Sequence, residues 1–275
     1  MEKFKATVRS LAAQLNLNVE SIASHGLAHA KAIGALGALN VFSHYIQHCQ
    51  DLCADQELAS FMSFYAEKWR SSRSQYSQDI FVMFITNCKQ AGSFLEIGGA
   101  DGITHSNTIA LEKTFGWSGV LVEPDPSQFC QISKFRVGNT LINAAISPDG
   151  NYGERKLRQI GQISALEGFE GKDYHYSRRM TSSRFIRVKT ISINQLLSEN
   201  HFDYFSLDVE GAELQILNSV KWSSINKPRV MTIEHNGRHS DLSSLRELLI
   251  DIGYQEHFES HDWLRGCDLW MTLCE

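Results

Sequence analysis

A glycine-rich turn stands between two acidic residues, each of which lies at the end of an apolar segment. The first segment contains Glu96, glycines follow at positions 98, 99 and 102, and the second segment ends at Glu123. This spacing is typical of a nucleotide site at the carboxyl edge of a parallel sheet. The glycines allow a tight turn and close approach of the backbone to a ligand. Glu123 can accept hydrogen bonds from both hydroxyls of a ribose.

The spacing of the glycines distinguishes between cofactors. A dinucleotide site needs the pattern G-x-G-x-x-G, because the pyrophosphate then lies on a helix N-terminus. Here Ala100 and Ile103 occupy two places of that pattern. Glu96 and Asp101 would repel a pyrophosphate, whereas they suit the cationic amine and sulfonium of S-adenosylmethionine. The sequence therefore predicts a methyl-donor site in preference to a nicotinamide site.

A second acidic group follows another apolar segment, at residues 204–209. Asp208, Glu210 and Glu213 surround Gly211, which would turn the chain into a helix. Three carboxylates at one place repel one another, so a cationic partner is expected nearby. Helix capping is the alternative interpretation, because acidic residues are favoured in a first helical turn.

The next predicted strand ends in Glu234 and His235. Neighbouring parallel strands end at the same edge of a sheet, so both residues should emerge beside Asp208. Methyl transfer to a hydroxyl needs the oxygen close to the methyl group and a base for the proton. Histidine, with a pKa of about 6.5, is the usual acceptor at neutral pH. We predict that His235 is the base and that Asp208 and Glu210 complete the catalytic group, with His105 as a competing base.

A metal ion is the alternative use of this edge. Asp208, Glu234 and His235 could bind Mg²⁺ or another divalent cation, which would bring the acceptor oxygen to the methyl group and lower its pKa. Oxygen ligands suit Mg²⁺, while the histidine would favour a transition metal. The sequence does not choose between the two interpretations.

Strands and helices alternate over the part of the chain that carries these residues. Predicted strands cover residues 93–97, 119–123, 140–145, 204–209, 229–234, 254–259 and 268–273, and predicted helices cover residues 78–90, 106–115, 191–197, 212–220 and 242–252, with another beginning at residue 126. The alternation predicts an α/β fold, a doubly wound and mostly parallel seven-stranded sheet of the Rossmann-like, class I methyltransferase type. Ligands of such sheets bind across the carboxyl ends of the strands.

The chain divides into two predicted parts. Residues 1–72 show only helical patterns and predict a helical extension, either a cap or an element for homodimer formation. Residues 73–275 predict the S-adenosylmethionine-dependent domain, in which the glycine-rich residues 148–187 form an inserted loop or irregular hairpin suited to a substrate lid. A basic group in this insertion is either a solvated loop or a site for an acidic or phosphorylated acceptor. Its members are Arg178, Arg179, Arg184, Arg187 and Lys189.

Composition excludes several classes of function. The 275 residues are 43% hydrophobic, and the net charge of −5 argues against a general nucleic-acid binder. No stretch of roughly 18 uncharged apolar residues predicts a membrane span, and the N-terminus lacks the apolar core of a secretion signal. Six cysteines without C-x-x-C spacing predict reduced thiols and a cytoplasmic location. A group at helical spacing, namely His44, His48, Cys49 and Cys53, fits zinc binding or simple packing.

Together these motifs resemble the FkbM family of S-adenosylmethionine-dependent methyltransferases. The resemblance is carried by residues 74–79, 94–108, 122–124, 143–147 and 206–213. The family typically reads Gly-Ala-Asn-Asp-Gly where this chain has Gly-Gly-Ala-Asp-Gly, so Ala100 removes one polar side chain near the ligand. The resemblance implies a cofactor site made of Glu96, Gly98 and Asp101 at the methionine moiety, with Asn107 in the motif after the turn, Glu123 at the ribose, and Asn143 and Ala144 at the adenine edge.

The predicted function is O-methylation. By the same resemblance, the methyl group would pass from S-adenosylmethionine to a hydroxyl of a small molecule, a carbohydrate or a glycosylated secondary metabolite. Three alternatives remain: a nicotinamide oxidoreductase, which lacks its glycine pattern; a catalytically inactive cofactor-binding module; and a protein or peptide methyltransferase whose helical extension binds the target.

Overall fold

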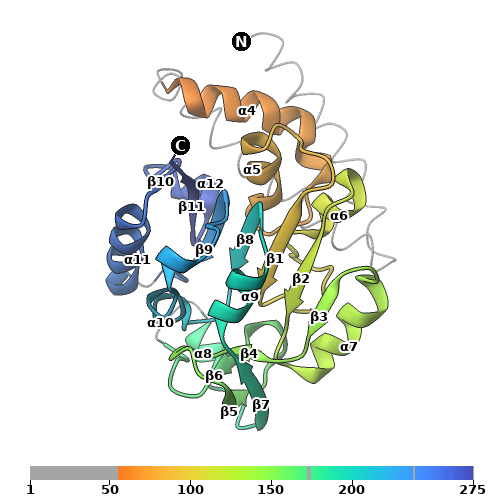
Figure 1. Cartoon of the computed structure of the whole chain (residues 1–275), viewed down its shortest axis with the longest axis vertical. Coiled ribbons are helices and arrows are strands. Elements are labelled where there is room, and N and C mark those ends of the chain that lie inside the picture. The colour runs from red at the N-terminus through yellow and green to blue at the C-terminus, as the bar shows by residue number, and fades with distance from the viewer. Residues whose placement is uncertain (1–54, 172–174, 238, 275) are drawn as a thin grey trace.

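The computed structural model describes residues 55–171, 175–237 and 239–274. Its centre is a seven-stranded sheet with the order β10-β11-β9-β8-β1-β2-β3. The strands are β1 (Ser93–Ile97), β2 (Ser118–Val122), β3 (Thr140–Ile142), β8 (Tyr204–Leu207), β9 (Val230–Glu234), β10 (Tyr254–Glu256) and β11 (Asp268–Leu273). Pairings from β3 through β9 are parallel, whereas β11 runs antiparallel to both β9 and β10. The predicted mostly parallel sheet, with its terminal hairpin, is confirmed (Figure 1).

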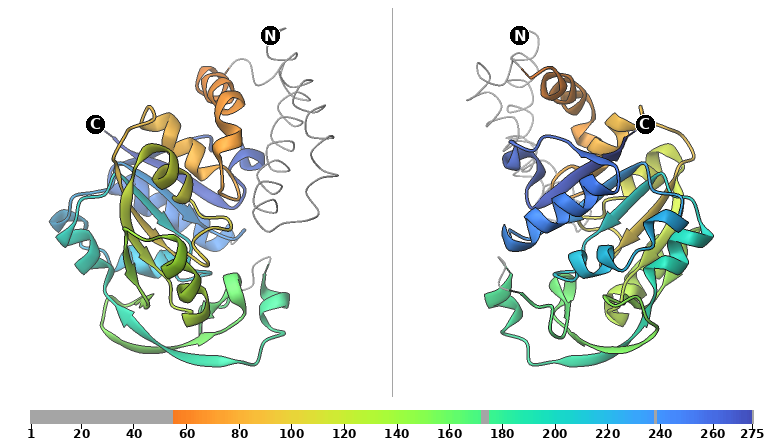
Figure 2. Two further views of the ribbon diagram at one scale, coloured as in Figure 1. Left: turned by 90° about the vertical axis from the view of Figure 1, so that its right-hand side faces the viewer. Right: turned by 60° about the vertical axis from the view of Figure 1, so that its left-hand side comes forward.

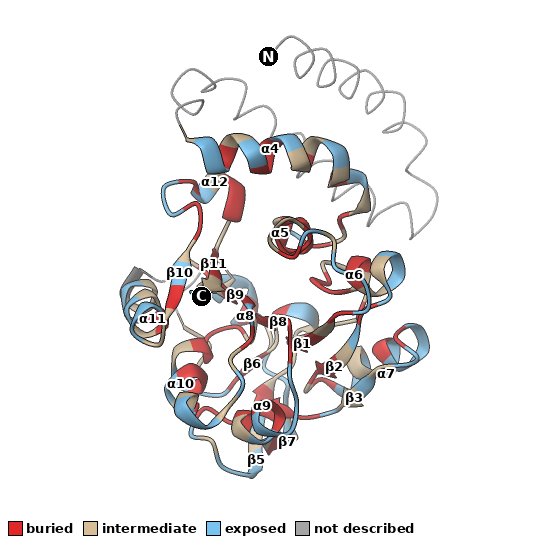
Figure 3. Cartoon of the chain, turned by 45° about the horizontal axis from the view of Figure 1, so that its top comes forward, coloured by how far each residue is buried: buried red, intermediate tan, exposed pale blue. Residues whose placement is uncertain are grey.

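Helices cover both faces of this sheet, as expected for strands that are buried on two sides. One face carries α5 (Gln78–Ile85), α6 (Ile109–Phe115) and α7 (Pro126–Phe135), and the other carries α9 (Ile193–Glu199), α10 (Glu213–Asn218) and α11 (His239–Asp251). Alternation along β1 explains the two cores, because Phe94 packs with the first set of helices and Leu95 with the second. Figure 3 shows the buried residues concentrated in the strands and on the inward sides of the helices.

The described part of the predicted helical extension packs on the first face. Helix α4 (Gln56–Lys68) is followed by a short 3-10 turn, η2 (Trp69–Ser71). Asp55 caps α4 by accepting from the backbone N–H of Leu58 at 2.9 Å. The ring of Phe61 lies 5.8 Å from that of Trp270 in β11 and 5.0 Å from that of Phe258. Residues 1–54, with the predicted zinc group, lie outside the described residues, so the cap or dimer role stays a prediction.

Two predicted elements differ most from the structure in their extent. The predicted strand 140–145 is two strands in different sheets, β3 and β4 (Ala145–Ile146). Asn143 lies between them, and its side-chain amide donates to the backbone carbonyl of Glu123 at 2.8 Å, which turns the chain out of the first sheet. The predicted helix 78–90 ends at Ile85, because Asn87 and Cys88 adopt left-handed backbone angles.

The insertion is more regular than an irregular hairpin. It contains β5 (Gly153–Arg158), η3 (Gly161–Ile163), β6 (Ala165–Leu166), α8 (Tyr176–Arg179) and β7 (Phe185–Ile191). These strands and β4 form a second sheet in the order β4-β7-β5-β6, in which β5 and β7 pair over six positions. The predicted helix at 191–197 accordingly begins only at Ile193, after the Ser192 cap. This second sheet lies at the end of the molecule away from α4 (Figures 1 and 2).

The remaining short elements are η4 (Trp222–Ser224) and α12 (Asp262–Arg265). Among the helices of the described ranges, none is both long enough and apolar enough to cross a membrane.

Candidate active site

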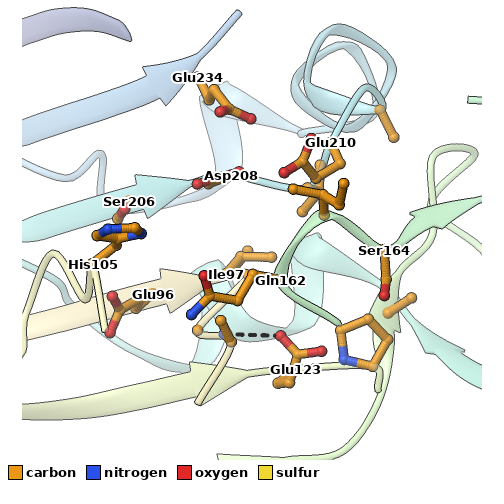
Figure 4. A pocket seen from close by; sticks show the side chains of 18 of the residues that line it. Glu96, Ile97, His105, Glu123, Gln162, Ser164, Ser206, Asp208, Glu210 and Glu234 are labelled. Carbon is orange, nitrogen blue, oxygen red and sulfur yellow. Dashed lines mark hydrogen bonds between the residues drawn. The ribbon is translucent and has the colours of Figure 1, made fainter. Parts of the chain in front are cut away.

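A cavity of about 1230 Å³, part of it open to solvent, lies at the carboxyl edge of the large sheet. The turns after β1, β2, β8 and β9 form one side, and residues of the second sheet and of α8 form the other. In Figure 4, Asp208, Glu210 and Glu234 gather at one side of this cavity, while Glu123 lies at another. The site is therefore where a doubly wound sheet binds its ligands.

The glycine turn is held between the two neighbouring strands. Gly98 has φ +87°, and a Cβ atom there would lie 1.6 Å from the backbone oxygen of Asp208. The N–H groups of Gly98 and Gly99 both point to the carbonyl of Val122, at 3.0 and 3.3 Å. Only glycine fits this position, because it allows both the left-handed angle and the close approach to the β8 end.

Glu96 fastens the turn to the helix that follows. Its carboxylate accepts from the backbone N–H of Asn107 at 2.8 Å, from the hydroxyls of Ser106 and Thr108, and from Arg136 at 3.5 Å. These bonds delay the start of α6 to Ile109, later than the predicted residue 106. Glu96 lines the cavity, as expected of a residue at the methionine moiety. Its visible role is to orient the loop whose other groups can reach a ligand.

Asp101 serves the same loop from outside the cavity. Its Oδ1 accepts from the backbone N–H groups of Ile103 and Thr104, at 2.9 and 2.7 Å, which is an Asx turn. The side chain does not line the cavity, in contrast to its neighbour Ala100. The predicted contact between Asp101 and the methionine moiety thus has no direct counterpart in the geometry.

Asn107 carries an acceptor that the protein leaves unused. The residue is 7% exposed and lines the cavity. Its Nδ2 donates to Ser206 Oγ at 2.9 Å, while its buried Oδ1 has no hydrogen-bond partner among the described residues. A buried acceptor without a partner costs about 1–3 kcal/mol. A cationic amine at the methionine end of the cofactor would satisfy it, so this position fits S-adenosylmethionine.

Glu123 is held in place by two backbone groups. It accepts from Ala100 N–H at 2.9 Å and from Asp125 N–H at 2.7 Å. Burial raises the pKa of Glu123 to about 8, against the lowering effect of these two bonds. Each carboxylate oxygen retains a second lone pair for a ribose hydroxyl. Of the predicted adenine-edge residues, Ala144 lines the cavity, whereas Asn143 is exposed and supports the chain after Glu123.

The carboxylate cluster consists of Asp208, Glu210 and Glu234, whose oxygen atoms lie within 4.8 Å of one another. The register explains the meeting, because Leu207 of β8 pairs with Ile233 of β9 and the acids follow one residue later. Burial, then the charge of Asp208, raises the pKa of Glu234 well above its ordinary value. Burial also raises the pKa of Asp208. One proton shared by the two groups would reduce their repulsion.

Glu210 is tied to the insertion by a buried ion pair. Arg179, fully buried in α8, donates from Nη2 to Glu210 Oε2 at 2.6 Å. Asn236 donates its Nδ2 to Glu210 at 3.1 Å and to Glu234 at 2.6 Å. The arginine is the cationic partner that the acidic sequence predicted. Asn236, which sequence reasoning did not single out, holds two of the three carboxylates together.

Two predicted residues of this edge point elsewhere. Glu213 accepts from the N–H groups of Val209 and Gly211, at 3.0 and 3.1 Å, which is the capping role considered above. His235 does not line the cavity, although its neighbour Glu234 does. Burial, and next the charge of Arg265, lowers the pKa of His235 to about 4.

Several residues that line the cavity were not predicted. They are Gln75, Gln162, Ser164, His175 and Ser206, with Arg178 known only as part of the basic group. Gln75 had a signal, because it stands in a motif shared with the FkbM family. The buried carboxylate of Asp79 explains its position, since it accepts from Ser72 and Ser74 hydroxyls at 2.7 Å and so shapes the loop before α5.

The donor atoms of the carboxylate cluster are also of the type that binds a divalent cation. Asp208, Glu210 and Glu234 offer only carboxylate oxygens, the preferred ligands of Mg²⁺, Mn²⁺ and Ca²⁺. His235 is not among these donors, so the geometry does not favour a metal that prefers nitrogen ligands, such as Zn²⁺, at this place. Arg179 already balances one of the charges.

The strand order, with an antiparallel seventh strand, and the cavity at its carboxyl edge define a class I methyltransferase fold. The chain belongs to the methyltransferase FkbM domain family, whose model matches residues 96–256. It is an S-adenosylmethionine-dependent methyltransferase. Among curated proteins, none matches the chain significantly.

Solved structures of other methyltransferases are similar at a low level. A TehB-like S-adenosylmethionine-dependent methyltransferase from Corynebacterium glutamicum has 12% identity and a TM-score of 0.41, over 85% of this chain and 97% of that one. A precorrin-6y C5,15-methyltransferase from Geobacter metallireducens has 13% identity and a TM-score of 0.39, over 70% and 84%. A methyltransferase from Pyrococcus furiosus has 14% identity and a TM-score of 0.37, over 78% and 95%. Such low similarity says nothing further about this chain.

Proposed function

We propose that the protein methylates a hydroxyl oxygen of a small molecule, with a sugar or glycosylated metabolite as the acceptor. The observation that carries the proposal is the half-buried acidic pair Asp208 and Glu234, which faces the same cavity as the glycine turn. A neutral hydroxyl needs a base before it can attack a methyl group, whereas an amine does not need one at the same stage. Carboxyls whose pKa values are raised by burial are suited to this task near neutral pH.

The chain's own residues then have separate tasks. S-adenosylmethionine would supply the electrophilic methyl group. Asn107 Oδ1 would accept from its amine, and Glu123 would accept from the ribose hydroxyls. The pair of Asp208 and Glu234 would accept the acceptor's hydroxyl hydrogen and take up its proton as the oxygen–methyl bond forms. Asn236 would keep Glu234 oriented. His235 stays the alternative base.

A divalent cation is the alternative use of the cluster. It would be held by Asp208, Glu210 and Glu234, and its chemistry would be to lower the pKa of the acceptor hydroxyl. The predicted homodimer and the predicted cytoplasmic location stay predictions.

Calorimetric titration with S-adenosylhomocysteine tests the cofactor site. We expect saturable binding to the wild type that Glu123→Ala and Asn107→Leu each weaken by about tenfold or more, since each removes hydrogen bonds to the ligand. Glu154→Gln, an exposed change in the second sheet, is the matched control and should bind normally. Absence of binding to the wild type would refute the proposal, whereas binding without turnover of any acceptor would favour the inactive cofactor-binding module.

Turnover of acceptors from a panel of sugars and polyols tests the base. We expect Glu234→Gln and Asp208→Asn to lower kcat by about 100-fold or more with S-adenosylhomocysteine affinity retained. His235→Ala should keep most of the activity. The opposite ranking would assign the base to His235. Chelation followed by titration with Mg²⁺ or Mn²⁺ decides on the metal, because a required ion would restore a lost activity.

A further inference from the structure

The basic group of the insertion separates into different roles in the structure. Arg187 pairs with Glu154 at 3.8 Å on the outer face of the second sheet. Arg179 is buried against Glu210. Arg178, which directly precedes Arg179, is exposed and lines the cavity. Only this arginine of the group is therefore placed to meet a molecule in the site.

Arg178 and His175 reach the cavity from the same turn of chain. They are three residues apart at α8, a spacing that puts side chains on one helical face. Arg179, the next residue, points away from that face to Ile163 and Glu170 carbonyls and to Glu210. His175 lies close enough to Asp208 for its charge to influence that carboxyl. The two residues thus extend from the carboxylate cluster toward the mouth of the cavity.

Arg178 is an isolated charge in this setting. Among the described residues that line the cavity, the other ionisable side chains are carboxylates and two histidines. The guanidinium forms no hydrogen bond or ion pair with any described residue, although several acids share the cavity. A planar guanidinium recognises carboxylate and phosphate groups through paired N–H donors. The partner expected for the Arg178 guanidinium is therefore an anionic group that enters the cavity as part of a ligand.

We propose that Arg178 and His175 form a subsite for an anionic group, a carboxylate or a phosphate, on the methyl acceptor. The inference rests on the proposed function, because it assumes that the acceptor hydroxyl lies at Asp208 and Glu234. A hydroxylated molecule that spans the two places, such as a sugar acid or a sugar phosphate, fits both the acidic cluster and the cation. Neutral sugars would use the cluster alone.

Binding of three matched probes to the protein saturated with S-adenosylhomocysteine tests the subsite. The probes are glucuronate, glucose 6-phosphate and glucose, titrated by calorimetry at low and at high salt. We expect at least one anionic probe to bind roughly tenfold more tightly than glucose, with a preference that salt reduces. Arg178→Gln should abolish the preference and Arg178→Lys should restore part of it. Arg184→Gln, an exposed arginine outside the cavity, is the control and should bind like the wild type.

The outcomes separate this inference from the proposed function. S-adenosylhomocysteine should bind Arg178→Gln as tightly as the wild type. If its affinity falls, the guanidinium serves the cofactor's own carboxylate and the subsite is wrong. Equal binding of glucose and both anions, or no binding of any probe to a wild type that does bind S-adenosylhomocysteine, also overturns the subsite. Failure of the wild type to bind S-adenosylhomocysteine refutes the proposed function itself. The tighter of the two anions identifies carboxylate or phosphate.

Discussion

The ion pair between Arg179 and Glu210 joins the insertion to the carboxylate cluster, and removing one partner should destabilise the whole fold. The guanidinium is fully buried, the side chain of Glu210 is 8% exposed, and Nη2 lies 2.6 Å from Oε2. Arg179→Met leaves the Glu210 carboxylate without this guanidinium, while Asn236 still donates to it at 3.1 Å. Breaking a buried pair from one side costs about 3–5 kcal/mol.

The two single changes are not equal. Arg179→Met also removes donors to the carbonyls of Ile163 and Glu170, at about 1 kcal/mol each, so its loss should be about 5–7 kcal/mol. Glu210→Gln keeps an acceptor for the guanidinium and should cost about 2–3 kcal/mol. In the double variant neither charge has lost a charged partner, because both members of the pair are replaced. Its loss should therefore be about 2 kcal/mol smaller than the sum of the two single losses.

Urea unfolding followed by circular dichroism measures this coupling. The exposed pair of Arg187 and Glu154, 3.8 Å apart in the second sheet, gives a matched control cycle, where the coupling should stay below about 0.5 kcal/mol. Additive losses for Arg179→Met and Glu210→Gln, within about 0.5 kcal/mol, would refute the reasoning. The pair would then contribute no more than the exposed one.

Two further changes test the site and its surroundings. Gly98→Ala should lower S-adenosylhomocysteine affinity more than tenfold, because the new Cβ would lie 1.6 Å from the carbonyl oxygen of Asp208. Gly116→Ala is the control, since Gly116 also has a positive φ but no atom lies near its added Cβ. This control should cost about 1 kcal/mol of stability and leave binding intact. Normal binding by Gly98→Ala would show that the turn relaxes. Burial raises the pKa of Asp268 to about 7, so its charge opposes folding above that pH. Asp268→Asn keeps an acceptor for Gln78 and should be more stable than the wild type at pH 8, by an amount that shrinks as pH falls through 7 and disappears near pH 4. Equal unfolding midpoints at pH 8 would contradict this cause.

The parts that the sequence predicts well depend on short-range spacing. The glycine turn, with Glu96 before it and Glu123 at the end of the next strand, forms from neighbouring segments of chain. The meeting of Asp208 with Glu234 follows from one rule about parallel strands ending at a common edge. The second sheet is different, because β5 and β7 pair residues such as Gly153 and Thr190 that are far apart in sequence. Glycines in the intervening segment suggest irregularity and do not reveal that pairing.

The direction in which a side chain points at the end of a strand is also hard to predict from sequence. Glu234 and His235 are adjacent, and successive side chains of a strand point to opposite faces, so an uncertainty of one residue exchanges their roles. The register decides it: Glu234 pairs with Asp268, while the backbone N–H of His235 donates to the carbonyl of Cys267 beyond the strand. A histidine is the more familiar base, but the position facing the cavity belongs to the carboxylate.

Side-chain direction also distinguishes Arg178 from Arg179, and the sequence does not predict which of the two faces the cavity. Consecutive helical residues point about 100° apart, so two identical side chains side by side can have unlike surroundings. Arg179 enters the interior and balances Glu210, which makes the acidic cluster tolerable, while Arg178 is left with the solvent and the cavity. Composition counts both as one basic group. The structure assigns one to the fold and leaves the other for a ligand, which is why the charge of the acceptor can be inferred only after the partner of Arg179 is known.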